Sequence, residues 1–160
     1  GKDGRTTIFD YWSVATVRHW RNKDKFDGKL LTDKQKQLQH FYSKLLNLCN
    51  QEKAIYEGQF FDLMYVNFGK ADFNVHKHYA FFRKQGNELL LIIANFDKHA
   101  SKISVNIPSH AFDFLQIPQN ESYTATELLT EKEEKLSLLP YRPTETFVEG
   151  FSGKILKFVL

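Results

Sequence analysis

The pattern of apolar and polar residues changes near residue 58. Before that point apolar residues recur at spacings of three and four, and after it they alternate with polar residues or form short continuous runs. The first pattern is typical of an amphipathic helix and the second of strands. The sequence therefore predicts one or two helices in residues 1–57 and an all-β domain in residues 58–160, with no linker between them.

The clearest helix is predicted over residues 33–50. Thr32 takes the N-cap position and Gln35 follows three residues later, which is the spacing of a capping box. A shorter helix around residues 11–21 is too small to cover the apolar stripe of the longer one, so we expect part of its natural partner to be missing from this chain. The stripe consists of Leu38, Phe41, Tyr42, Leu45, Leu46 and Cys49.

The region after residue 58 predicts an antiparallel β-sandwich of about eight strands with Greek-key-like connections, because turn residues recur every eight to twelve positions. Gln85-Gly86-Asn87 predicts a tight hairpin, since Gly and Asn tolerate positive φ. The run 89–96 is apolar at both parities and predicts a central strand. The predicted strands are 59–66, 77–84, 88–96, 102–107, 123–128, 135–139, 144–149 and 154–160.

The composition of the chain excludes several classes of function but points to none. The chain has 160 residues, 42% of them hydrophobic, and its 22 Lys and Arg are interleaved with 19 Asp and Glu to a net charge of +3. This is a solvated surface and not the basic patch of a nucleic-acid binder. No apolar run is long enough for a membrane span, and the compartment stays open between bacterial periplasm, extracellular space and cytoplasm. The absence of an initiator Met before Lys2 predicts a piece of a longer chain.

Few residues suggest chemistry. The single Cys49 excludes an internal disulfide and is interpreted as a buried, inert thiol. His76 and His78 would share one face of a strand, as two zinc ligands can, but no third ligand is identifiable and we prefer an ordinary exposed strand start. No glycine-rich phosphate loop or nucleophile elbow is present, so neither a metal nor a cofactor is expected in this chain.

The acids do not suggest a catalytic pair. Glycoside hydrolysis needs two carboxylates held across a sugar in a cleft. The densest acidic run, which contains Glu131, Glu133 and Glu134 between Lys132 and Lys135, is interpreted as a solvated loop. Aromatic residues are densest over 8–12, with Trp20 further on; aromatic rings stack on sugars, but such residues are more often core.

The order of several segments resembles the alpha-amylase family, glycoside hydrolase family 13. The segment DGRTTIFDYWS, residues 3–13, is similar to the stretch after the eighth barrel strand, and residues 31–49 resemble the last barrel helix. YAFFR at 79–83 and the run 89–97 resemble paired strands of the sandwich that follows the barrel. The closing KILKFVL, 154–160, resembles the final strand of that sandwich.

This resemblance implies that residues 1–57 are the end of a catalytic (β/α)8 barrel and that 58–160 form the C-terminal β-domain. The family's catalytic Asp, Glu and Asp would all precede Lys2, so no catalytic residue is assigned and the chain alone is expected to be inactive. The implied parent is a retaining hydrolase or a transglycosylase acting on starch-like α-glucans. The implied partner is the missing barrel, which would also hold any calcium. Arg5, Tyr11 and Trp12 become candidates for contact with the substrate rim.

Three readings remain open for the β-domain. It supports the missing barrel, or it binds starch-like glucan on an exposed aromatic platform, or it is a non-enzymatic sandwich with an unrelated protein partner. The platform in the second reading would be built from Tyr65, Phe68 and Phe73.

Overall fold

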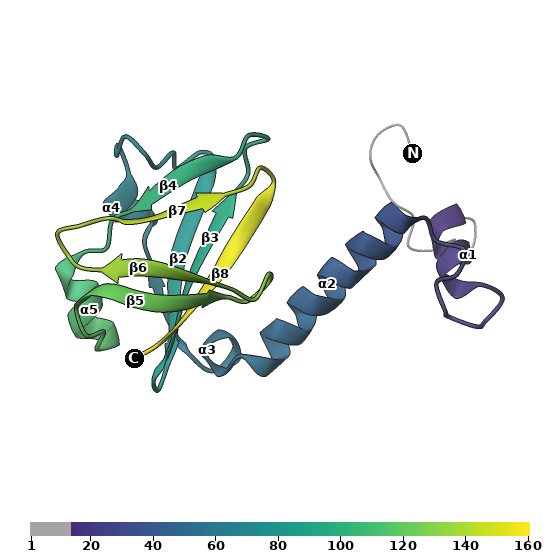
Figure 1. Cartoon of the computed structure of the whole chain (residues 1–160), viewed down its shortest axis with the longest axis horizontal. Helices are drawn as coiled ribbons and strands as arrows, with labels where there is room; N and C mark the ends of the chain where they lie inside the picture. Colours follow the sequence, from purple (N-terminus) through teal and green to yellow (C-terminus); the bar gives the residue numbers. More distant parts are fainter. Residues whose placement is uncertain (1–13) are drawn as a thin grey trace. The chain divides into compact units, whose positions relative to one another are not determined.

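The structure is a computed structural model that describes residues 14–160 (Figure 1). Its contacts divide the chain into two compact units, Gly1–Leu46 and Asn47–Leu160. This division falls within a helix, whereas the sequence places a domain boundary after residue 57. The boundary at 57 stays a prediction.

The described part of the first unit holds α1, Ala15–Arg21, and the beginning of α2, Asp33–Gln51. The predicted helix over 33–50 is confirmed, and so is its capping box. The Gln35 N–H donates to Thr32 Oγ1 over 3.4 Å, and the Thr32 N–H donates to Gln35 Oε1 over 2.9 Å. These two bonds satisfy backbone donors at the start of α2 that have no partner within the helix.

No residue of α2 is buried. Leu38, Phe41, Tyr42 and Leu46 are exposed at 58%, 43%, 55% and 61%. An apolar stripe of this length is unfavourable in water, because helices in proteins owe most of their stability to packing of the apolar face. Within the described residues, four of the six predicted stripe residues are therefore exposed along α2. Cys49 is only half-buried, so the expectation of a buried thiol at this position is wrong.

The second unit is mainly antiparallel β, and the described residues contain eight strands as predicted. The predicted hairpin is confirmed, with Gly86 at φ +55° between β2 and β3. The elements are α3 Lys53–Tyr56, β1 Gln59–Asp62, α4 Met64–Asn67, β2 His78–Gln85, β3 Glu88–Asn95, β4 Ser101–Val105, α5 Ser109–Leu115, β5 Asn120–Glu127, β6 Lys132–Leu138, β7 Thr144–Val148 and β8 Ser152–Val159.

Five strand boundaries differ from the predictions by two residues or more. The strands predicted from 123, 135 and 154 begin earlier, at Asn120, Lys132 and Ser152, and two other predicted strands end earlier. The strand predicted over 59–66 stops at Asp62, and Met64–Asn67 is the short helix α4. The strand predicted over 102–107 stops at Val105. The side chain of Asn67 explains the early end of the first strand. It is fully buried, and its amide donates to the carbonyls of Leu63 and Asn106, which turns the chain out of the sheet.

The strands form one sheet of order β1-β2-β3-β8-β5-β6 and a pair, β4-β7. The predicted central strand is confirmed, because β3 lies between β2 and β8 and Leu89, Leu90, Leu91 and Ile93 are fully buried. Only two residue pairs join β5 to β8, and the large sheet bends at this junction. Figure 1 shows β5 and β6 lying across β2, β3 and β8, with β4 and β7 beside them. The result is a two-layered sandwich.

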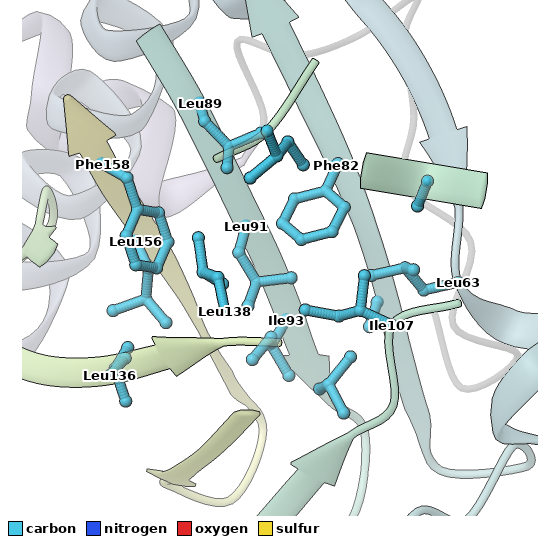
Figure 2. Close-up of a cluster of buried hydrophobic side chains, with 14 of the residues drawn as sticks. Leu63, Phe82, Leu89, Leu91, Ile93, Ile107, Leu136, Leu138, Leu156 and Phe158 are labelled. Carbon is cyan, nitrogen blue, oxygen red and sulfur yellow. The ribbon is translucent and has the colours of Figure 1, made fainter. Parts of the chain in front are cut away.

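The core lies between these two layers (Figure 2). Phe82 of β2 and Leu91 of β3 meet Leu156 of β8, while Leu138 of β6 enters from the other layer; all four side chains are fully buried. α5 closes the sandwich with Phe112 and two smaller apolar residues. The alternation of the strands thus directs one apolar set inward, as the sequence predicts.

Glu127, at the end of β5, stabilises the weak junction between β5 and β8. Its side chain is only 2% exposed. Oε1 accepts the N–H groups of Leu129 and Ile155 at 3.1 and 3.2 Å. Oε2 accepts the N–H and the hydroxyl of Thr130 at 2.7 and 2.6 Å. The carboxylate therefore binds the turn after β5 and the backbone of β8 at once.

Candidate functional site

The large sheet has an apolar outer face that the described residues cover only in part. We define the outer sheet face as Phe60, Tyr79, Phe81, Ile92 and Ala94, which project away from the core on β1, β2 and β3. Phe81 packs on Phe60 and on Tyr79, with ring centroids 5.4 and 5.6 Å apart. Phe60 and Tyr79 are 47% and 38% exposed. Aromatic residues in such a cluster are typical of a protein interface.

α3 is fixed to one end of the same face. Arg83 donates through Nε to the Ala54 carbonyl over 3.0 Å, and the Ala54 N–H donates to Glu88 Oε1 over 2.8 Å. Lys157 pairs with Glu52 at 2.5 Å and with Glu88 at 3.0 Å. Burial opposes ionisation of Glu88, but the Ala54 N–H and the Lys157 ammonium outweigh burial and lower the pKa of Glu88. Hydrogen bonds and ion pairs therefore hold α3 to this end of the sheet.

A second surface lies over β1, the edge strand of the large sheet, where α5 approaches that strand and Tyr65 of α4 lies near it. Phe61, Tyr65, His110 and Phe114 line a hollow of about 840 Å³, which we call the aromatic groove; Phe60 borders it. The ring of Phe61 lies 5.5 Å from that of His110 and 5.9 Å from that of Phe114. Tyr65 and Phe114 are 54% and 55% exposed. The groove therefore presents aromatic rings to solvent from three separate elements.

Polar groups stand among these rings. The Tyr65 hydroxyl lies 2.7 Å from Nε2 of His110. Asp62 and Asp113 line the groove, and no hydrogen bond of either carboxylate is seen among residues 14–160. Burial, together with the negative charge of Asp62, raises the pKa of Tyr65. Tyr65 donates to or accepts from His110 according to the tautomer of that imidazole ring.

A polar hollow of about 690 Å³ lies at the first residue of β1 and just beyond the C-terminal end of α5. It is lined by Gln59, which precedes Phe60, and by Gln116, which immediately follows α5. Asn87 and Lys84 complete its polar wall. Amide side chains both donate and accept hydrogen bonds. The aromatic groove and the amide-lined hollow thus follow one another along the same strand.

The structure tests only some of the candidate residues that the sequence suggested. Arg5, Tyr11 and Trp12 lie outside the described residues. In the suggested platform, Tyr65 and Phe68 are exposed at 54% and 74%, but Phe73 is buried at 2% exposure. Phe73 packs edge-on against His78 with centroids 5.5 Å apart, so it belongs to the core and the platform as suggested is wrong.

His76 and His78 do not form a pair on one strand face. His78 begins β2 and is buried, whereas His76 precedes the strand and is exposed. Nδ1 of His78 accepts the Asn74 N–H over 3.1 Å, and Nε2 lies 3.4 Å from the Ser101 hydroxyl. Burial lowers the pKa of His78. Within residues 14–160 no cluster of three or more His, Cys, Asp or Glu is arranged to hold a metal ion.

The acidic run is a strand and not a loop. Glu133 and Glu134 lie in β6, and only Glu131 belongs to the turn. The Thr146 hydroxyl donates to Glu134 Oε2 over 2.8 Å, and Lys154 pairs with the same carboxylate. The run folds as a strand because its alternation exposes charges on one face while Leu136 and Leu138 enter the core. Glu134 holds β6 to β7 and β8.

Neither protein-family models nor curated proteins match the chain. Solved structures do. The noncanonic maltogenic alpha-amylase AmyB from Thermotoga neapolitana is 16% identical with a TM-score of 0.54, over 73% of this chain and 24% of that chain. AmyP in complex with maltose is 16% identical with a TM-score of 0.57, over 82% and 23%. The Geobacillus thermoleovorans alpha-amylase complexed with acarbose is 12% identical with a TM-score of 0.54, over 81% and 24%.

The chain therefore has the fold of a segment of alpha-amylase structures. It spans about a quarter of the length of the chains it matches. At these identities the similarity concerns the fold. No helix within residues 14–160 combines the length and apolar character needed to cross a bilayer.

Proposed function

We propose that the chain is the C-terminal part of an alpha-amylase-type glycoside hydrolase acting on α-glucans, and that its β-domain supports a (β/α)8 barrel in the same polypeptide. The observation that carries this proposal is the fold it shares with several alpha-amylases over most of its length. The order of elements, a long helix followed by a sandwich, is the order that the sequence resemblance implies.

The two apolar surfaces support the structural role. The stripe of α2 and the outer sheet face each expose large apolar side chains, as protein interfaces do. The proposed occupant is the remainder of the same chain, because the matched segment covers only 24% and 23% of two alpha-amylase structures. Catalysis then belongs to the family's Asp, Glu and Asp in that remainder, by retaining cleavage or transglycosylation. Arg5, Tyr11 and Trp12 stay proposed contacts at its substrate rim.

Two matched substitutions in the complete polypeptide test the proposal. Phe60 on the outer sheet face and Phe147 on the exposed face of β7 are both on strands and are 47% and 53% exposed. If the barrel covers the outer sheet face, Phe60→Ala removes roughly 100 Å² of apolar contact and costs about 2 kcal/mol, whereas Phe147→Ala costs little. Thermal unfolding of the complete polypeptide in the absence of glucan measures both.

Equal melting temperatures for the two variants would show that the outer sheet face has no partner in the parent. The sequence upstream of Lys2 is an independent check, since it should encode a barrel with three catalytic carboxylates. An upstream region without these carboxylates would contradict the proposed activity of the parent on α-glucans.

A further inference from the structure

Charged and polar groups stand among the rings of the aromatic groove. The central part of a protein interface is depleted of charged residues. The groove meets the outer sheet face along β1 at Phe60 and Asp62. Within it the carboxylates of Asp62 and Asp113 stand among the rings, and the Tyr65 hydroxyl is held at His110. Half-exposed rings with polar groups between them suit a ligand that is itself apolar on its faces and polar at its edges.

A pyranose ring has this character, because its C–H groups form apolar faces and its hydroxyls project from the edges. Aromatic rings that are 54% and 55% exposed, such as Tyr65 and Phe114, offer faces for those C–H groups. The carboxylates of Asp62 and Asp113 accept hydrogen bonds from hydroxyls, and the hydroxyl of Tyr65 supplies a complementary polar atom.

The polar hollow extends the site along the strand. Gln59 and Phe61 are two residues apart on the same face of β1, and they line the polar hollow and the groove respectively. Gln116 follows α5, whose Phe114 lines the groove. A surface with aromatic rings at one end and amides at the other suits a ligand longer than one sugar. One sugar unit would stack on the rings, and the next would hydrogen-bond to the amides.

We infer that the aromatic groove binds a segment of a glucan chain outside any catalytic centre, with Phe114 and Tyr65 as the stacking residues. The choice of an α-linked glucan rests on the proposed function, while the choice of a pyranose chain rests on the groove alone. In the parent enzyme such a site would hold polymeric substrate on the β-domain.

The test is a titration of the 160-residue chain with maltoheptaose, followed by calorimetry, in parallel with cellohexaose. Phe114→Ala should weaken binding about ten-fold, as expected for loss of one stacking contact. Phe147→Ala is the matched control, since Phe147 is 53% exposed on β7 and distant in sequence from the groove. Tyr65→Phe keeps the ring, removes the hydroxyl, and should weaken binding only a few-fold.

The outcomes separate this inference from the proposed function. Binding of maltoheptaose that weakens in Phe114→Ala and not in Phe147→Ala supports both. The same pattern with cellohexaose alone supports the groove as a glucan site and contradicts the α-glucan function. Failure to bind either sugar, or binding that Phe114→Ala leaves unchanged in a folded protein, overturns the inference. A loss of self-association in Phe114→Ala without sugar binding would identify a second copy as the occupant and would overturn it equally.

Discussion

Replacing Glu127 with Gln should destabilise the β-domain by about 2 kcal/mol, although the two side chains have nearly the same size and shape. The buried carboxylate accepts four hydrogen bonds, two at each oxygen. An amide keeps one oxygen and replaces the other with a donor. The less costly orientation places the new NH2 group at Oε2, because the Thr130 hydroxyl can rotate to accept from it.

The size of the destabilisation follows from the hydrogen bonds that this orientation of the amide loses. The Thr130 N–H loses its charged acceptor, at about 1 kcal/mol, because Thr130 is an exposed residue and water can take the place of the carboxylate. The bonds from Leu129 and Ile155 persist but lose the charge of the acceptor, at about 1 kcal/mol each. The cost of burying an ionised carboxylate disappears at the same time and offsets part of this loss. A net destabilisation of about 2 kcal/mol remains, equivalent to a fall in melting temperature of roughly 8 °C for a domain of this size.

Urea unfolding followed by circular dichroism measures the difference. Glu133→Gln is the matched control, because Glu133 is exposed on β6 and pairs across the sheet with Thr126 of β5. This control should change the free energy of unfolding by less than about 0.5 kcal/mol. Glu127→Gln within the same limit would refute the role of the carboxylate at the junction of β5 and β8.

Two further predictions concern a surface ion pair and a helix cap. Lys77→Met should raise the pKa of Asp97, which the Lys77 ammonium and the His99 N–H hold well below its usual range. The stability that this pair contributes is present above the unfolded-state pKa of Asp97 and is lost as pH falls through its folded-state pKa; NMR titration of the Asp97 carboxyl checks the shift, and an unchanged pKa contradicts it. Thr32→Ala should cost about 1 kcal/mol by removing the hydroxyl that caps α2, seen as faster amide exchange at Gln35 with later turns unaffected.

The elements that the sequence predicts well are those whose pattern is long enough to be periodic. α2 and β2, β3 and β8 each span seven residues or more, and the run 89–96 is apolar at both parities. The short helices α4 and α5 are not predicted. Their apolar residues cover one or two turns, too few to distinguish the period of a helix from that of a strand.

The aromatic groove shows a second limit. Its rings come from β1, α4 and α5, and Phe61 and Phe114 are 53 positions apart in sequence. No local pattern connects them, and α5 has to be known before Phe114 can be placed. A weak signal was nevertheless present, since residues 109–115 read SHAFDFL after Pro108, with apolar residues at positions 111, 112 and 115. That spacing fits a short helix whose other side carries His110 and Phe114.

The position of β8 between β3 and β5 has a consequence for synthesis on the ribosome. The strand that joins the two halves of the large sheet is the one made after all the others described. At 5–20 residues per second, β2 and β3 wait on the order of ten seconds before β8 emerges to cover the open edge of β3. During that interval the apolar strand β3 has one unpaired side and is exposed to aggregation.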